Sequence, residues 1–163
     1  MRRSLALALD GVAAEPGNPI HYFLAGSAYA ELGQLKEADG MFAEAQSIYP
    51  AYELDIEPER ERAWALAFNE GIEAYGEGDV EAAIDAWSRA CVIFDLRPDA
   101  HRNLGVLLAG EGRYDEAVEV YERALAGLER RPARRVLSDA EVLDRERARI
   151  EIEEDAAELL LYS

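Results

Sequence analysis

The sequence of 163 residues is poor in the side chains that build covalent and catalytic sites. It has one cysteine, Cys91, two histidines, and a single lysine, Lys36, beside sixteen arginines. One cysteine excludes an internal disulfide and any multi-cysteine metal site, and we expect Cys91 to be a small buried residue. No apolar run reaches 18 residues, so the sequence predicts no membrane-spanning helix.

Positive charge is also scarce. Thirty-four acidic residues against seventeen basic ones leave a net charge of −17. The excess is spread along the chain, with 9 acidic and 3 basic residues in 1–57 and 9 and 5 in 132–163. A field of this sign repels nucleic acid and anionic membranes and favours basic partners, so we exclude nucleic-acid binding.

The N-terminus has some features of a secretion signal: two arginines, an apolar run, and the small residues Ala13 and Ala14. The run ends at Asp10 after about six residues, below the 7–15 apolar residues that a signal core needs. A helix fragment explains the same residues, and we expect a cytoplasmic protein. Export is the alternative.

Catalytic motifs are missing from the sequence. There is no glycine-rich phosphate loop, no His-x-x-Glu-His motif and no EF-hand spacing. His21 and His101 have no nucleophile in register, so we interpret both as packing or helix-start residues. The densest acidic cluster is better explained as a solvated helix face than as a cation site. Its members are Glu151, Glu153, Glu154, Asp155 and Glu158. We therefore expect no enzymatic activity, no cofactor and no metal.

One pattern of small and aromatic residues occurs three times. The third copy consists of Gly105, Gly112, Ala117, Tyr121 and Ala124. A shift of 34 residues places these on Gly71, Gly78, Ala83, Trp87 and Ala90. A further shift of 45 residues places them on Gly26, Gly33, Ala38, Phe42 and Ala45. Five columns agree in all three copies, which indicates an internal repeat.

A unit of 34 residues with this pattern resembles the tetratricopeptide repeat, whose signature is W-x2-L-G-x2-Y, then A-x3-F, then Pro. The first copy matches at Tyr22, Gly26, Tyr29, Ala38, Phe42, Ala45 and Pro50. The third carries Leu104, Gly105, Leu108, Ala117, Tyr121 and Ala124. The second departs from the signature, with Ala67, Glu70 and Ala74 at its Trp, Leu and Tyr sites.

This resemblance implies an all-α fold, a right-handed α-solenoid of three antiparallel helix pairs. The expected order is an N-terminal helix in 1–17, repeat 1 in 18–50, an insert in 51–61, repeat 2 in 62–97, repeat 3 in 98–131 and a long C-terminal capping helix in 132–163.

The two glycine columns are expected to have different roles. Gly26, Gly71 and Gly105 lie within first helices and allow close helix approach. We expect Ala38, Ala83 and Ala117 to face these gaps, and Phe42, Trp87 and Tyr121 to fill the space between neighbouring units. Gly33, Gly78 and Gly112 are expected to end the first helices in the left-handed conformation.

The C-terminal segment begins with a capping box, Ser138 to Glu141, and continues as an amphipathic helix. Its predicted apolar face consists of Val136, Ala140, Leu143, Ile150, Ala157 and Leu161, interrupted by Arg147 and Glu154. We expect this face to cover the last repeat. A partner-binding or dimerising helix is the alternative.

In the insert, Pro58 is a candidate start for an extended first helix of repeat 2. Two interpretations of the remaining residues fit. An acidic lip beside a groove would be formed by Tyr52, Glu53, Asp55 and Glu57. A tolerated surface insertion is the alternative, and it is the preferred interpretation.

The resemblance also implies that the first helices line a concave, peptide-binding groove. Its lining is expected to be Phe23, Leu24, Ser27, Phe68, Asn69, Ile72, Tyr75, Arg102, Asn103 and Val106. In this register Asn69 and Asn103 hold a peptide backbone, while Phe23, Phe68 and Tyr75 receive apolar side chains. The alternative is that these residues pack against the chain's own terminal helix.

Chaperone-binding members of this family resemble one another in a clamp of Lys, Asn, Asn, Lys and Arg, which grips a C-terminal carboxylate. This sequence lacks that clamp, so we exclude the chaperone-binding subfamily. The matching sites here are Phe23, Ser27, Asn69, Asp99 and Asn103, of which only Asn69 agrees. We expect a non-enzymatic adapter that binds a basic or apolar peptide or helix of another protein. The alternative is a structural subunit that self-associates or helps assemble an envelope or secretion complex.

Overall fold

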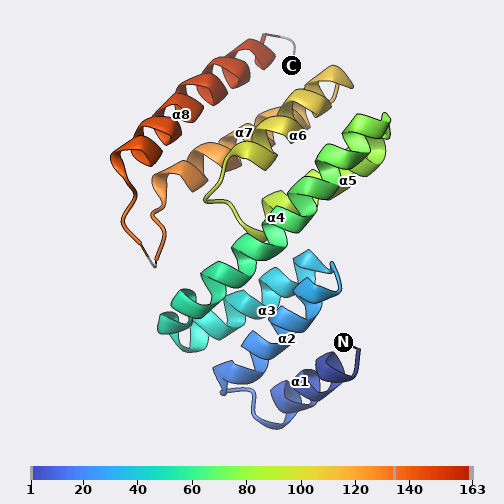
Figure 1. Cartoon of the computed structure of the whole chain (residues 1–163), viewed down its shortest axis with the longest axis vertical. Coiled ribbons are helices and arrows are strands. Elements are labelled where there is room, and N and C mark those ends of the chain that lie inside the picture. Colours follow the sequence, from blue (N-terminus) through green and yellow to red (C-terminus); the bar gives the residue numbers. More distant parts are fainter. Residues whose placement is uncertain (1, 134, 162–163) are drawn as a thin grey trace.

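A computed structural model describes residues 2–133 and 135–161. Within these ranges the chain is all-α, as predicted, and its helices stack in chain order from one end of the molecule to the other (Figure 1). They are α1 (Arg2–Ala14), α2 (Pro19–Glu31), α3 (Leu35–Ile48), α4 (Glu53–Glu77), α5 (Val80–Ile93), α6 (Asp99–Gly110), α7 (Tyr114–Glu129) and α8 (Asp139–Leu159), with a short 3-10 helix, η1 (Pro50–Tyr52). The pairs α2/α3, α4/α5 and α6/α7 are the three repeats.

An aromatic ring lies against a glycine in every helix pair. The pairs are Gly26 with Phe42, Gly71 with Trp87 and Gly105 with Tyr121. A Cβ atom built on any of these glycines would lie 2.3–2.6 Å from a ring atom. Ring atoms are the nearest neighbours of the absent Cβ in each pair, so the aromatic side chain fills the space beside the glycine. The alanines Ala38, Ala83 and Ala117 are fully buried in the surrounding core.

The second glycine column ends the first helices as predicted. Gly33, Gly78 and Gly112 have φ of 73°, 80° and 75°, the left-handed region. In each case the amide of the following residue donates to a carbonyl five residues back, as Gln34 does to Tyr29 at 3.0 Å. This is the Schellman pattern, which satisfies carbonyls at the helix end.

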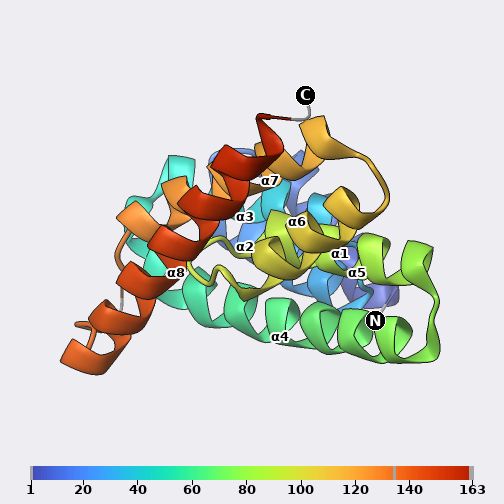
Figure 2. The same cartoon turned by 90° about the horizontal axis from the view of Figure 1, so that it is seen from above.

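The insert is an extension of α4 rather than a loop. This helix runs for 25 residues from Glu53, so Pro58 lies inside it and does not begin it. Ile56 is fully buried in the core. Seen from above, α4 spans nearly the whole width of the molecule (Figure 2). The helical part of 51–61 therefore belongs to α4, and Glu53 and Asp55 are exposed on its surface.

The capping box of α8 is confirmed, because the Glu141 amide donates to Ser138 Oγ at 3.3 Å and the Glu141 carboxylate accepts from the Ser138 amide at 2.9 Å. These hydrogen bonds from Ser138, aided by Arg135, lower the pKa of Glu141 to about 2.

The predicted apolar face of α8 is wrong. All six side chains are exposed, and the large ones range from Ile150 at 48% to Val136 at 92%. Ala148, Ile152 and Leu159 are buried instead. The prediction followed the positions of the apolar residues alone. The helix instead turns toward the core the face that carries Ala148, Ile152 and Leu159 together with Arg145. The first turns of α8 extend past the rest of the molecule (Figure 2).

Candidate functional site

The ten residues predicted to line the groove lie on α2, α4 and α6. Four apolar side chains are well exposed: Leu24 47%, Ile72 49%, Tyr75 57% and Val106 60%. Asn69 is also exposed, whereas Phe23, Ser27, Phe68, Arg102 and Asn103 are half-buried. Ile72 and Val106 occupy equivalent places, one residue after the mid-helix glycine of their units.

Several of these side chains are already engaged by the chain itself. The Phe23 ring centroid lies 5.6 Å from that of Tyr52, and the Tyr75 centroid lies 5.9 Å from that of Trp87. Arg102 forms an ion pair with Glu151 of α8. Arg102 therefore contacts the terminal helix, as the alternative interpretation expects. The Phe23 and Tyr75 rings each have one aromatic neighbour within the chain, which leaves less of their surface for a partner.

A cavity of about 500 Å³ opens beside α4, between the α5–α6 loop and the start of α8. Of the predicted residues, Phe68 and Asn69 line it. Trp64, which the sequence analysis missed, also lines it and is only 3% exposed. The Trp64 and Phe68 rings are stacked, with centroids 4.8 Å apart and an interplanar angle of 9°. The sequence could have predicted this stacking, because side chains four residues apart on a helix are neighbours. We call this the aromatic cavity.

Charged groups surround these rings. Five acidic residues and three arginines line the aromatic cavity: Glu57, Glu61, Asp99, Glu141, Asp144, Arg97, Arg135 and Arg145. The Arg97 guanidinium lies 4.9 Å from the Trp64 ring centroid and 3.6 Å from the Glu61 carboxylate. Among the described residues the Trp64 indole N–H has no hydrogen-bond partner.

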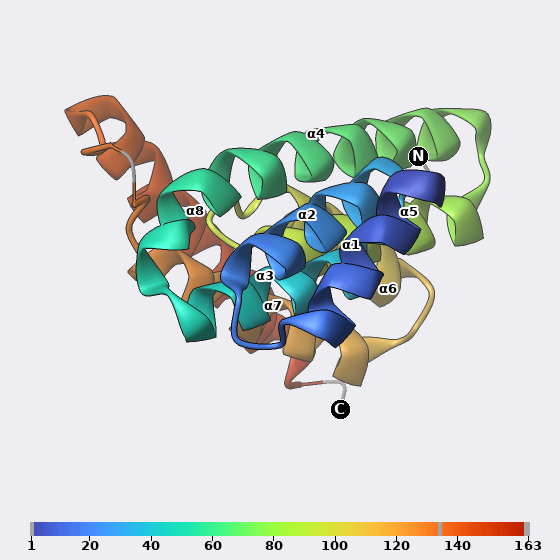
Figure 3. The ribbon, with the colours of Figure 1, turned by 90° about the horizontal axis from the view of Figure 1, so that it is seen from below.

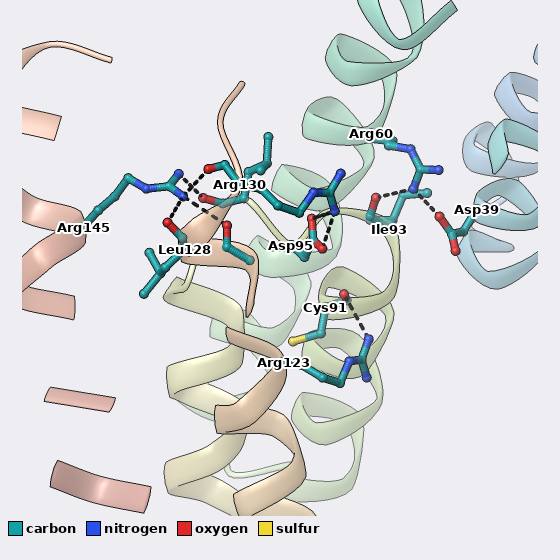
Figure 4. A network of polar contacts seen from close by, with 11 residues as sticks. Asp39, Arg60, Cys91, Ile93, Asp95, Arg123, Leu128, Arg130 and Arg145 are labelled. Atoms are coloured by element: carbon teal, nitrogen blue, oxygen red, sulfur yellow. Dashed lines mark hydrogen bonds and ion pairs between the residues drawn. The ribbon is translucent and has the colours of Figure 1, made fainter. Parts of the chain in front are cut away.

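Arg145 fixes the wall of this cavity formed by α8 (Figure 4). Its guanidinium donates to the carbonyl of Leu96 at 3.1 Å and to three carbonyls at the end of α7. These are Gly127 at 3.0 Å, Leu128 at 2.7 Å and Arg130 at 2.7 Å. A helix C-terminus carries partial negative charge, so a cation there is stabilised. Burial, followed by Arg149 and Arg135, lowers the pKa of Arg145.

Other arginines hold the ends of α5 and α7 in the same manner (Figure 4). Arg60 of the α4 extension binds Asp39 and donates to the Ile93 carbonyl at 3.0 Å. Arg130 binds both carboxylate oxygens of Asp95, at 2.6 and 2.8 Å. A Cβ on Gly127 would lie 2.0 Å from the Asp95 carbonyl oxygen, so only glycine permits this contact.

The sulfur and imidazole groups are not placed for chemistry. Cys91 is buried as expected, and burial raises the pKa of its thiol to about 12. His101 is fully buried, which lowers its pKa to about 4 and keeps it neutral. The imidazole of His21 lies 3.3 Å from the Glu15 carboxylate beside Gly11, where α1 packs on α2 (Figure 3). These placements fit the packing and helix-start roles.

Within the part of the chain that the structure describes, no cluster of three or more His, Cys, Asp or Glu residues is arranged to hold a metal ion. None of the helices in residues 2–133 and 135–161 is both long and apolar enough to cross a membrane.

Comparison with known proteins identifies the family. Two family models described as tetratricopeptide repeat match residues 22–52 and 68–134, together more than half of the chain. The chain belongs to the tetratricopeptide repeat family. Two crystal structures of MamA are similar at 20% identity, each with a TM-score of 0.33. The similarity covers 94% of this chain and 89% and 83% of the MamA chains. No match was found among curated proteins.

Proposed function

We propose that this protein, as a tetratricopeptide repeat scaffold, is a non-enzymatic adapter that binds a peptide or helix of a partner protein on the α2, α4 and α6 face. The supporting observation is the set of apolar side chains left exposed there, with Ile72 and Val106 repeated at equivalent places. Exposed apolar groups at regular spacing provide contacts for an elongated ligand, and Asn69 beside them offers an amide to its backbone.

The aromatic cavity supports a basic partner. Arg97 already places a guanidinium over the Trp64 ring and beside Glu61, so the cavity accommodates this chemistry within the chain itself. Cations bind the faces of tryptophan rings, and acidic residues outnumber basic ones in the lining. A partner cation reaches the Trp64 ring face by displacing Arg97, whose side chain is half exposed. The partner segment is therefore one that presents arginine or lysine between apolar residues.

A second candidate function is a structural or assembly subunit that uses α8. The observation in its favour is the α8 stripe that the fold leaves uncovered, including Leu143 at 53% and Ile150 at 48% exposure. This alternative places the binding surface on α8 and predicts that changes on α4 and α6 do not affect association.

A comparative capture experiment separates the two. The bait is the parent protein beside a groove variant, Asn69→Ala/Ile72→Ala/Val106→Ala, whose three wild-type side chains are all exposed. A matched control is Leu66→Ala, which is 61% exposed on α4 but lies about a third of a turn around the helix from Ile72.

We expect mass spectrometry to find a protein captured by the parent and Leu66→Ala but lost from the groove variant. Identical capture by all three baits would refute groove binding and favour the α8 alternative. Circular dichroism checks that each bait is folded.

A further inference from the structure

Basic residues are concentrated in one short stretch of this acidic chain. Residues 130–149 contain seven of the sixteen arginines and only four acidic residues. The remaining 143 residues contain ten basic and thirty acidic residues. The stretch begins at Arg130, directly after α7, and extends to the middle of α8.

The described part of this stretch forms a second cavity, of about 770 Å³, between the end of α7 and α8. Its lining includes five arginines: Arg130, Arg131, Arg135, Arg145 and Arg149. Only two acidic residues, Glu129 and Glu146, line it with them. We call it the basic notch. It shares Arg135 and Arg145 with the aromatic cavity but none of that cavity's acidic residues.

Positive charge in the notch is incompletely neutralised. Arg145 donates to backbone carbonyls, which attract a cation without cancelling its charge. Arg149 has a single carboxylate contact, to Glu146 at 3.8 Å, and no ion pair involves Arg131 in the described part of the chain. Burial, and after it the nearby guanidinium groups of Arg149 and Arg135, lowers the pKa of Arg145.

The acidic remainder of the molecule does not cancel this local field. At physiological ionic strength, exposed charges separated by more than about 8 Å are largely screened. A short anionic group in the notch therefore interacts mainly with the arginines. A long polyanion such as nucleic acid extends onto the negatively charged surface outside, where it is repelled.

Apolar side chains beside the arginines narrow the class of ligand further. Val136 is 92% exposed and Val142 is 53% exposed, and both line the notch. We propose that the basic notch binds an acidic segment of a partner protein, whose carboxylates contact Arg131 and Arg149 while an apolar side chain packs on Val136 and Val142. This site is separate from the α2, α4 and α6 face and does not depend on the function proposed for it.

The test uses a fluorescein-labelled peptide of alternating Glu, Asp and Leu residues, with a Gln, Asn and Leu peptide as the neutral control. Fluorescence anisotropy measures its affinity for the full chain and for Arg149→Glu. The matched control is Arg147→Glu, on the same helix about 200° away. Arg147 resembles Arg149 in its ion pair, because it lies 3.8 Å from the carboxylate of Asp144, three positions earlier. Unlike Arg149, it does not line the notch. Arg131→Glu removes no hydrogen bond or ion pair seen between the described residues, so it guards against loss of folding.

We expect Arg149→Glu and Arg131→Glu each to weaken binding by about tenfold or more, and Arg147→Glu by about twofold or less, because a buried or close charge contributes far more than a remote one. The neutral peptide should not bind. Equal losses in Arg147→Glu and Arg149→Glu would overturn the proposal, as they would indicate general charge attraction. Equal competition by inorganic phosphate or a short DNA strand would also overturn it, because the notch would then be a general anion site.

Discussion

The middle repeat and its two neighbours place different residues at the same site, four positions before the mid-helix glycine. Tyr22 in the first repeat donates its hydroxyl to the Pro16 carbonyl at 3.1 Å. Ala67 in the second is buried and small, and His101 in the third is fully buried. Where Ala67 supplies little volume, Trp64 is buried three residues earlier on the same helix. The repeat thus tolerates loss of its signature residue when a neighbouring turn supplies an aromatic ring.

The site just before that glycine differs in the same way. Ala25 and Leu104 are buried there, whereas Glu70 in the middle repeat is exposed and pairs with Arg89 at 2.9 Å. Glu70 therefore does not disturb the interior of its unit. The middle repeat departs from the signature most, yet its helix pair has the same glycine–aromatic contact as the others.

The largest expected effect is on this shared contact. Trp87 is 4% exposed, and its indole N–H donates to the Phe68 carbonyl at 3.2 Å. Trp87→Ala should lower the free energy of unfolding by ~3–5 kcal/mol, because it empties a large buried site. Chemical denaturation measures this. A melting temperature within a few degrees of the parent would show that the middle repeat does not rely on its ring.

The glycine side of the contact gives the next effect. Gly71→Ala places a Cβ 2.3 Å from the Trp87 indole nitrogen, so we expect a loss of ~1–3 kcal/mol from overpacking. Gly76, on the same helix, has open space around its Cβ position. Gly76→Ala should be neutral or stabilising by up to ~1 kcal/mol. Equal stabilities of the two variants in urea would contradict the close approach.

His101 makes the third repeat sensitive to acid. Its pKa is lowered from 6.5 to about 4 in the folded state, mainly by burial, so the unfolded chain binds the extra proton first. The stabilisation is complete above pH 6.5 and is lost as the pH falls toward 4. Between pH 7.5 and 5 it should fall by about 2 kcal/mol. His101→Phe should remove this part of the pH dependence, and an unchanged profile in that variant would refute the assignment.

The smallest effect is expected at the polar pair of the middle repeat. Glu70→Gln should change the free energy of unfolding by less than about 1 kcal/mol, since exposed ion pairs contribute little. Denaturation at low and high salt measures this. A loss comparable with that of Trp87→Ala would mean that Glu70 has a structural role that its exposure does not show.

Local signals made much of the fold predictable from the sequence. The left-handed glycines and the Ser138 capping box depend on backbone geometry within a few residues, and the glycine–aromatic columns recur at fixed spacing. The buried face of α8 was missed because an arginine, Arg145, lies on it. Its contacts are carbonyls 15 to 49 residues away, which no periodicity reveals.

The candidate site was predictable only in part, for the same reason. Two of the predicted lining residues, Phe68 and Asn69, lie in the wall of the aromatic cavity. The other walls come from the α5–α6 loop and from α8, and the Trp64 ring lies outside the repeat signature. Tertiary packing of several segments, rather than any one helix, determines this part of the surface.

The most direct test of the proposed binding face is the fluorescence of Trp64 in a Trp87→Phe variant. This substitution removes the other tryptophan. Phenylalanine is chosen because Phe42 occupies the equivalent position in the first repeat. Peptides that alternate leucine with arginine, and matched peptides with glutamate, are titrated into this protein. Binding over the Trp64 ring predicts a saturable change with the arginine peptide that Ile72→Ala weakens, and none with the glutamate peptide. No response to the arginine peptide, or the same response to both, would contradict a basic partner at the aromatic cavity.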